Sequence, residues 1–494
     1  MQQTYSLPSA ALTRSYVPFP AKISQQGRDA LLASYPALSY HPHAEAYRRM
    51  VEYLIFSRFE DDEGRLIVPA TTIEKVVRGK PIAGKRHFAA ADWLYSFSQD
   101  VWRLNVSPHN HWEGEARTVI RDLPQDVQDI LEDEPLHAFG KTGGQVWFVT
   151  GIPVTRKKMY AEAATYTETL KLLADGVGPD HPAHTLMTYL NNQPQTTIGK
   201  IVRANWPRVL REFDNMPEGA SRDAAHRTLL VLRDYCKMIY AASERTPRLH
   251  ALGATIHQLP RALRKAALHG CVSLDARACQ LAVVAKLWDV PRVSEFLSSR
   301  QSIWTELLSA MGVGPDAKPL VKEALYSIIF GMKVINVRRN LLGLPNYQQS
   351  RKRGRRTPMS VKPVNDVSGE AADSFLAHPI IAELLAARQA RLRQIKRERH
   401  IVDAFGRRID YNRRQAKMRS LLAQEVQSYE VALMLSLLPI FEAERDLVVV
   451  SWLHDGVSVH VTDANQRERI VRRLQAVFSA RAASLGLLTL LEPE

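Results

Sequence analysis

The chain contains 494 residues, 45% of them hydrophobic, and carries a formal net charge of +15 at pH 7. This length exceeds one ordinary hydrophobic core, so we expect two or three subdomains. No apolar run approaches the ~20 residues of a membrane span, and residues 1–26 lack the regions of a signal peptide. Three cysteines without a CxxC pair argue against a disulfide framework or a zinc ribbon. We therefore expect an intracellular, cytoplasmic protein.

The positive charge predicts a polyanionic partner. Nucleic acid is a commoner partner than a membrane for a chain without a basic amphipathic helix at one end. A generally basic soluble protein is the alternative. The basic residues are clustered, however, at 351–356 and again between 388 and 399. This clustering favours nucleic-acid binding.

The predicted elements begin with a mixed, mostly helical region, residues 1–190, in which no motif indicates a role. Residues 198–243 predict two long amphipathic helices. From Thr246 onward strands and helices alternate, which indicates an α+β fold class. The later elements are, in order, a basic loop at 347–369, a long basic helix at 376–400, a helix at 413–441, a β-hairpin at 447–461, a helix at 466–485 and a final short strand.

Two aspartates far apart in the sequence each adjoin a predicted apolar strand. Asp275 follows residues 271–274 and precedes a helix predicted from about 278 to 288, and Asp455 lies in the turn of the hairpin. If both strands belong to one sheet, the carboxylates offer the oxygen ligands that Mg²⁺ prefers. Two divalent ions held in this way serve nucleotidyl transfer. Each aspartate also has a simpler explanation: Asp275 as a helix N-cap, and Asp455 with Gly456 as a hairpin turn.

One predicted helix combines basic and aromatic residues on a single face. Lys318, Lys322, Tyr326 and Phe330 recur every four residues, and each such step turns the face by only ~40°. Ammonium groups followed by aromatic rings suit a triphosphate and a stacked nucleobase. Gly331 would let a template base approach closely. A solvated basic edge is the alternative, and it explains the lysines better than the aromatic residues.

In their order along residues 240–494, these segments resemble the motifs of family A DNA polymerases, the polymerase I type. The matching segments are Thr246-Pro247-Arg248-Leu249 with His257 to Arg261 (Thr-Gly-Arg-Leu-Ser and Leu-Gln-x-Ile-Pro-Arg in the family), Ser273 to Leu281 (motif A), Lys318-x3-Lys322-x7-Phe330-Gly331 (motif B), Ala404 to Arg408 (a Gly-Arg-Arg segment) and Leu453-His454-Asp455 (motif C).

The resemblance implies a right-hand polymerase fold with an antiparallel palm sheet and helical fingers and thumb. Residues 191–245 would form thumb-like helices and residues 246–494 the palm and fingers, with the fingers at about 300–400. The implied activity is template-directed addition of deoxynucleoside triphosphates to a primer 3′-OH, with two Mg²⁺ ions as cofactors and template-primer DNA as partner. No proofreading exonuclease is evident, since Asp61-Asp62-Glu63 follows a helix-like stretch and is interpreted as a solvated turn.

The resemblance also implies roles for single residues. Asp275 and Asp455 would hold the metals, and with Lys322 they would be the catalytic residues. The nucleotide would contact Lys318, Lys322, Tyr326, Phe330 and Gln280, with Tyr326 near the sugar 3′ position, Gln280 on its 2′ side and Phe330 against the nascent base pair. The DNA would contact Arg248, Gln258, Arg407, Gln427 and His454.

Four positions depart from the family pattern. Gln280 stands where motif A has a glutamate, Gly456 where motif C has one, and Phe330 where motif B has a tyrosine. Lys318 replaces an arginine and cannot make its bidentate contact with a phosphate. These departures bear on sugar discrimination and on catalytic rate.

Two other functions remain open. A single-subunit RNA polymerase or primase-like enzyme has a related palm and lacks the motif C glutamate, although Phe330 and Gln280 favour DNA synthesis. A non-catalytic nucleic-acid-binding replication protein would tolerate eroded motifs, but it has no use for paired anions that face a phosphate backbone. A compact polymerase without proofreading would suit a phage or other mobile element.

Overall fold

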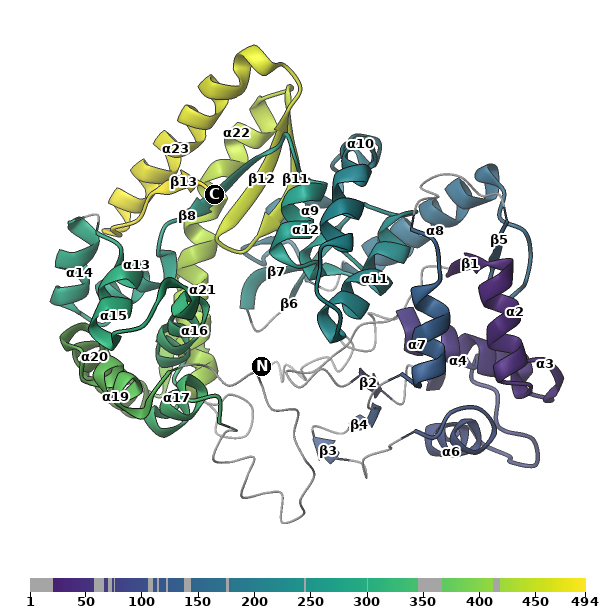
Figure 1. Ribbon diagram of the computed structural model, residues 1–494. Coiled ribbons are helices and arrows are strands. Elements are labelled where there is room, and N and C mark those ends of the chain that lie inside the picture. The colour runs from purple at the N-terminus through teal and green to yellow at the C-terminus, as the bar shows by residue number, and fades with distance from the viewer. Residues whose placement is uncertain are drawn as a thin grey trace, which may run out of the picture. The chain divides into compact units, whose positions relative to one another are not determined.

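The protein has mixed helices and strands that divide into two compact units (Figure 1). Unit 1 comprises Met1–Glu244, Leu249–Cys271 and Val448–Ser451, and unit 2 comprises Arg245–Arg248, Val272–Leu447 and Trp452–Glu494. The computed structural model describes residues 21–56, 66–69, 73–74, 76–104, 110–112, 115–120, 123–136, 144–174, 177–243, 246–299, 301–344, 367–411 and 418–494. Two predicted features, the basic cluster at 351–356 and the acidic residues at 61–63, lie outside the described residues.

Helices predominate in the described part of unit 1. The helices predicted within 198–243 are present as α10 and α11, followed by a strand that was not predicted. The elements are β1 Lys22–Ser24, α2 Gln25–Ser34, α3 Ala37–Tyr40, α4 Ala44–Phe56, β2 Leu66–Pro69, α6 Ala90–Asp100, β3 Asn110–Trp112, β4 Glu115–Ile120, α7 Gln125–Glu132, β5 Gln145–Trp147, α8 Arg156–Ala174, α9 His184–Asn191, α10 Gln195–Asp214, α11 Ala220–Leu232, β6 Ile239–Ser243, η1 Ile256–Gln258 and α12 Arg261–Ala267.

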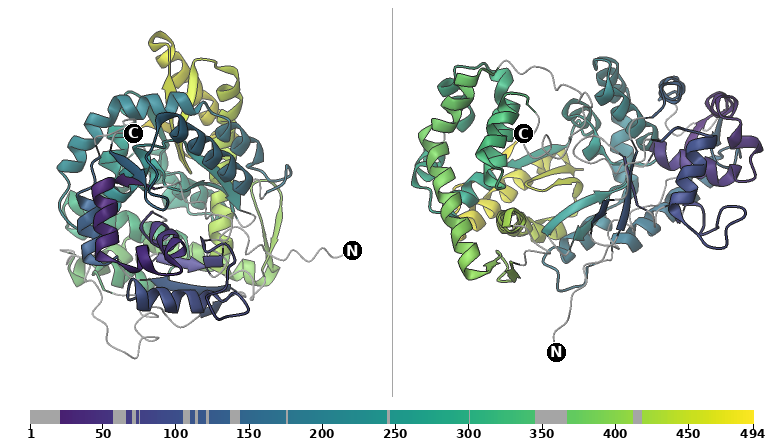
Figure 2. Two further views of the ribbon diagram at one scale, coloured as in Figure 1. Left: turned by 90° about the vertical axis from the view of Figure 1, so that its right-hand side faces the viewer. Right: turned by 90° about the horizontal axis from the view of Figure 1, so that it is seen from below.

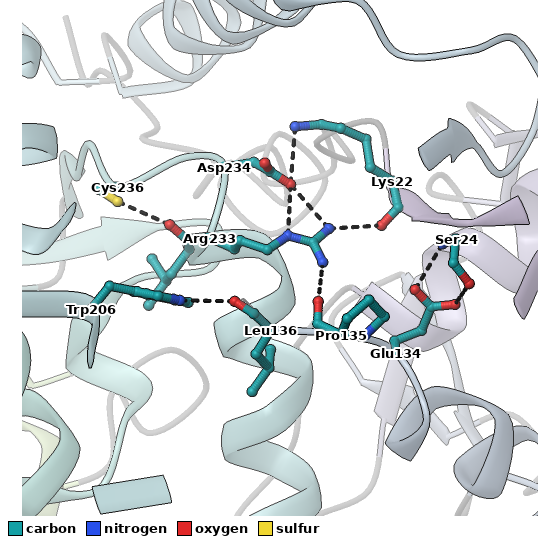
Figure 3. Close-up of polar contacts among 10 residues, drawn as sticks. Lys22, Ser24, Glu134, Pro135, Leu136, Trp206, Arg233, Asp234 and Cys236 are labelled. Carbon is teal, nitrogen blue, oxygen red and sulfur yellow. Dashed lines mark hydrogen bonds and ion pairs between the residues drawn. The ribbon is translucent and has the colours of Figure 1, made fainter. Parts of the chain in front are cut away.

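A buried ionic network joins three segments inside unit 1 (Figure 3). Arg233, just after α11, has no exposed side-chain surface and lies 3.2 Å from the carboxylate of Asp234. Its guanidinium also donates to Pro135 O at 2.6 Å and to Lys22 O at 3.3 Å. The ammonium group of Lys22 lies 3.1 Å from Asp234. Because buried charges are tolerated when they are paired and hydrogen-bonded, this network is part of the interior and gives no indication of a ligand.

Unit 2 contains the strands and helices from which the candidate site is built. Strand β7 Thr246–Leu252 and strand β11 each contribute residues to both units. The elements of unit 2 are β8 Val272–Ala276, α13 Cys279–Leu287, α14 Pro291–Ser298, α15 Ile303–Met311, η2 Pro315–Ala317, α16 Lys318–Ile329, α17 Val334–Leu341, α19 Gly369–Ala377, α20 Pro379–Glu398, β9 His400–Val402, β10 Arg408–Asp410, α21 Met418–Met434, η3 Leu435–Leu437, α22 Leu438–Ala443, β11 Leu447–Leu453, β12 Gly456–Val461, η4 Ala464–Gln466, α23 Arg467–Ser484 and β13 Leu491–Pro493.

A four-stranded sheet runs in the order β11, β12, β8, β13. Strand β8 is antiparallel to both of its neighbours, β12 and β13. Side chains alternate along β8, so Leu274 and Ala276 are buried while Asp275 between them is exposed. Helix α21 packs against α13, and α23 packs against β13. The predicted hairpin, the helix after it and the final strand are therefore confirmed as β11–β12, α23 and β13.

Helices α14, α15, α16, α17, α19 and α20 pack on one another, with further contacts to α13 and α21, and are drawn in teal to green in Figure 2. The basic helix predicted at 376–400 is present as α20, after a break at Pro379. Two of its arginines are bonded to other parts of the protein, so fewer of its positive charges can bind a partner than the sequence suggests. Arg388 is buried and donates to Ile328 O at 3.2 Å and to Met332 O at 2.7 Å. Arg391 donates to both carboxylate oxygens of Glu425. Both arginines therefore have structural partners within the protein.

Candidate functional site

Of the two aspartates singled out by the sequence, Asp275 lies on β8 and Asp455 lies in the turn that precedes the neighbouring strand β12. Gly456 of β12 is the Cα partner of Asp275 on β8, and Ala276 N donates to Asp455 O at 2.8 Å. The hairpin explanation for Asp455 is correct as geometry, since His454 and Asp455 form the turn between β11 and β12. The N-cap explanation for Asp275 is wrong. Helix α13 begins four residues later at Cys279, with Ala278 in the left-handed conformation at its N-cap.

Asp455 is largely buried and has both negatively and positively charged side chains around it. Burial, and after it the negative charge of Glu430, raise the pKa of Asp455 to about 6. The positive charges of Arg248 and Lys322 act in the opposite direction. His454 beside it has φ of 36°, which is uncommon for a residue other than glycine. The backbone of this two-residue turn is therefore unusual at the position next to the carboxylate.

Helix α16 has the two faces that the sequence predicts. Val321, Ala324 and Leu325 are buried, whereas Lys318 and Lys322 are exposed. The Nζ of Lys322 lies 5.8 Å from the centroid of the Tyr326 ring. The ring of Trp304 lies 6.2 Å from the same ring, so α15 contributes an aromatic neighbour that the sequence did not indicate.

The turn after α16, formed by Phe330 and Gly331, has the side chain of Arg419 beside it. Phe330 is the C-cap residue and is half-buried. Gly331 follows with φ of 79°, a conformation that favours glycine. A Cβ at residue 331 would lie 3.0 Å from Cγ of Arg419. The close neighbour at Gly331 is therefore the Arg419 side chain, and the template-base contact expected there stays a prediction.

Two side chains on different helices, Cys279 on α13 and Tyr326 on α16, have the same three carboxylates as neighbours. Burial raises the pKa of both side chains, and the negative charges of Asp275, Asp455 and Glu430 raise each of them further. A group on α13 and a group on α16 thus lie in the field of the same three carboxylates. Strand β8, the β11–β12 turn, α13, α16 and α21 therefore meet around one site.

Glu430 is the residue of this site that sequence analysis missed. Its side chain has no exposed surface, and it accepts hydrogen bonds from Nε and Nη2 of Arg248 and from Nε2 of Gln280 at 3.0 Å. The sequence does contain a pattern that indicates Glu430, because this glutamate stands between Val426 and Leu433 on the buried stripe of α21. A charged residue on such a stripe requires a partner.

Three further residues that were predicted to contact DNA, Arg407, Gln427 and Gln258, differ in burial and in their hydrogen-bond partners. The guanidinium of Arg407 is held by Asp403, with Nε and Oδ2 2.7 Å apart. Gln427 is half-buried on α21, near the middle of that helix. Gln258 belongs to unit 1, where its side chain completes a capping box with Thr255. The structure thus brings Gln427 and Arg407 into unit 2 with the aspartates, and it leaves Gln258 in the other unit.

The possible metal ligands of the site are carboxylate oxygens, which are the ligands that hard cations such as Mg²⁺ prefer. Among the described residues, no group of three or more His, Cys, Asp or Glu side chains could hold a metal ion. Mg²⁺ usually takes only one or two protein carboxylates and completes its shell with water and substrate phosphates. Asp275 and Asp455 supply carboxylates, the ligand type that Mg²⁺ takes from proteins in this small number.

Comparisons with known proteins identify no family. No family model matches the sequence. No curated protein matches it either. Among solved structures, the chain is similar to the POL domain of Pol1 from M. smegmatis in complex with DNA primer-template and dNTP, with a TM-score of 0.41, 12% identity, and coverage of 68% of this chain and 70% of that one. A likeness this distant carries no argument about function. In the described part of the chain, no helix is long and apolar enough to cross a membrane.

Proposed function

We propose that the chain is a template-directed DNA polymerase, which transfers nucleotides from deoxynucleoside triphosphates to a primer 3′-OH. The observation that carries this proposal is the juxtaposition of Asp275 on β8 with the turn residue Asp455, whose backbone oxygen accepts from Ala276 N and whose carboxylate lies in the field of Lys322. The three residues come from segments far apart in the sequence. Their order matches the order of the family A motifs that the sequence resembles.

The two aspartates would hold two Mg²⁺ ions. When bound, Mg²⁺ supplies Lewis-acid stabilisation of the charge on the attacking and leaving oxygens. The exposed ammonium groups of Lys318 and Lys322 would bind the triphosphate, because they precede the aromatic residues on the same helix. Tyr326 would face the sugar and Phe330 the nascent base pair. Gln280 would stand on the 2′ side of the sugar.

Template-primer DNA would be the second substrate. Arg248 and His454 would contact the DNA near the primer end and Gln427 the template-primer minor groove, and Arg407 and Gln258 would also contact the DNA. Phosphate contacts would supply most of the affinity, which would therefore weaken with salt. In this proposal the sheet that carries Asp275 forms the palm, residues of about 300–400 the fingers and residues 191–245 the thumb.

Extension of a labelled primer on a DNA template in Mg²⁺ tests the proposal. We expect extension with deoxynucleotides that is lost in Asp455→Ala. The matched control is Asp463→Ala, because Asp463 follows the far end of β12 and caps η4. Extension with ribonucleotides instead would indicate an RNA polymerase or primase-like enzyme. Tight template-primer binding without extension would contradict an enzymatic role.

A further inference from the structure

Glu430 holds two side chains that approach it from different elements. Arg248 lies on β7 and Gln280 on α13, at sequence separations of 182 and 150 residues from Glu430. A fully buried carboxylate is costly to maintain unless its charge is paired and its oxygens are hydrogen-bonded. Both conditions are met here. One carboxylate thus fixes a guanidinium and an amide relative to each other.

Both oxygens of Glu430 are already used. Oε1 accepts from Nε of Arg248 at 2.8 Å, and Oε2 accepts from Nη2 of Arg248 and from Nε2 of Gln280. Glu430 therefore does not replace the carboxylate that the family carries at the position of Gly456. Its charge acts on Asp455 through space, and its hydrogen bonds act on Arg248 and Gln280.

The hydrogen bond to Gln280 also fixes the orientation of that amide. An ionised carboxylate only accepts hydrogen bonds, so the amide nitrogen of Gln280 must face it. The carbonyl oxygen Oε1, on the other branch of the amide, then faces away from Glu430. Without this anchor the amide could rotate and offer a donor instead of an acceptor.

We propose that Glu430 is a positioning residue that sets sugar selectivity by holding Gln280 with its amide oxygen toward the nucleotide and Arg248 beside it. This inference rests on the proposed polymerase function. Gln280 is the group assigned to the 2′ side of the sugar, and selectivity there depends on where its amide stands and which atom it presents. Glu430 itself touches no substrate.

A double-mutant cycle tests this role. The variants are Glu430→Gln, Gln280→Ala and the double variant, and the measured quantity is the ratio of kcat/KM for dATP to that for ATP. We expect Glu430→Gln to change this ratio about tenfold, a typical effect for loss of a hydrogen bond to a charged group. We expect almost no further change when Glu430→Gln is added to Gln280→Ala.

Glu425→Gln is the matched control. Glu425 lies on the same helix, is also buried, and accepts from both Nε and Nη2 of Arg391. It should alter thermal stability about as much as Glu430→Gln and leave the dATP-to-ATP ratio unchanged. An equal change of the ratio in both variants would mean that any lost ion pair of α21 has this effect, which would overturn the positioning role.

The dissociation constants of dATP and ATP are measured in parallel, by displacement of a fluorescent nucleotide in Mg²⁺. If the wild-type protein extends no primer, the polymerase proposal fails, and the cycle is read from these constants. If the wild type extends primers but Glu430→Gln leaves the ratio unchanged, only the role of Glu430 is overturned. A protein that binds no nucleotide would overturn both.

Discussion

Gly456 lies opposite Asp275 in the pairing of β12 with β8, and a Cβ at residue 456 would lie 3.2 Å from Oδ1 of Asp275. The same Cβ would lie 3.3 Å from Leu274 O. A side chain at this position can therefore enter only if the Asp275 carboxylate or the strand moves. Leu453-His454-Asp455 resembles motif C of family A polymerases, in which a glutamate follows the aspartate. A glutamate at residue 456 would have its Cβ against the Asp275 carboxylate.

For the proposed polymerase, we predict that Gly456→Glu lowers kcat about tenfold or more, because a second carboxylate beside Asp275 both displaces it and repels it. Gly456→Ala separates the two causes, since it adds the crowding without the charge. We expect Ala to cost several-fold less than Glu. Single-turnover primer extension measures both. A gain of activity in Gly456→Glu would contradict the prediction.

A second prediction concerns the first residue of α16. Lys318 is exposed, and its ammonium group cannot make the two parallel hydrogen bonds that a guanidinium makes with a phosphate. Lys318→Arg should therefore lower KM for deoxynucleotides a few-fold and change kcat little. Lys333→Arg, at an exposed lysine that precedes α17, is the control and should change neither constant. An unchanged KM in Lys318→Arg would argue against a triphosphate contact there.

The elements that periodicity governs could be predicted from the sequence. The lysines and the apolar stripe of α16 follow from 3.6-residue spacing, and the hairpin around Asp455 follows from alternating apolar residues. The partners of buried charges could not be predicted. Nothing local links Glu430 to Arg248 or Glu425 to Arg391, because those contacts join residues far apart in sequence. Clustered charge indicates a basic surface only when its members are exposed, and Arg388 is buried.

A third prediction follows from Arg388. Its Nη1 donates to two carbonyls, Ile328 O and Met332 O, on either side of the turn that carries Phe330. Arg388→Met keeps much of the side-chain volume but leaves these carbonyls without that donor. We expect a loss of about 1.5–3 kcal/mol in the free energy of unfolding, and a higher KM for nucleotides if Phe330 contacts them. Urea unfolding and steady-state kinetics measure the two effects.

Arg393→Met is the control for this variant, because Arg393 lies on the same helix and is exposed. It should leave the free energy of unfolding within about 0.5 kcal/mol of wild type. If both variants were equally destabilised, the cause would be a general effect of charge removal on α20 rather than the lost carbonyl contacts.

A fourth prediction concerns pH and the interior of unit 1. Glu52 on α4 is buried and accepts from Ala21 N at 2.7 Å, and burial raises its pKa from 4.5 to about 7. The folded protein therefore binds this proton more tightly than the unfolded chain does. The stabilisation is fully present below pH 4.5 and is lost as pH rises through 7. The loss amounts to about 3 kcal/mol, at ~1.4 kcal/mol per pKa unit.

Glu52→Gln should remove this part of the pH dependence, because the amide keeps an acceptor for Ala21 N and does not titrate. The free energy of unfolding, measured in urea at pH 5 and pH 8, should fall less between these values in the variant than in the wild type. Glu45→Gln is the control, since Glu45 lies on the same helix and its side chain is 59% exposed beside Arg49. It should retain the wild-type pH dependence. If Glu52→Gln showed the same fall with pH as the wild type, Glu52 would have to be ionised in the folded protein at pH 5, and the burial of its charge would then require a cation beside it.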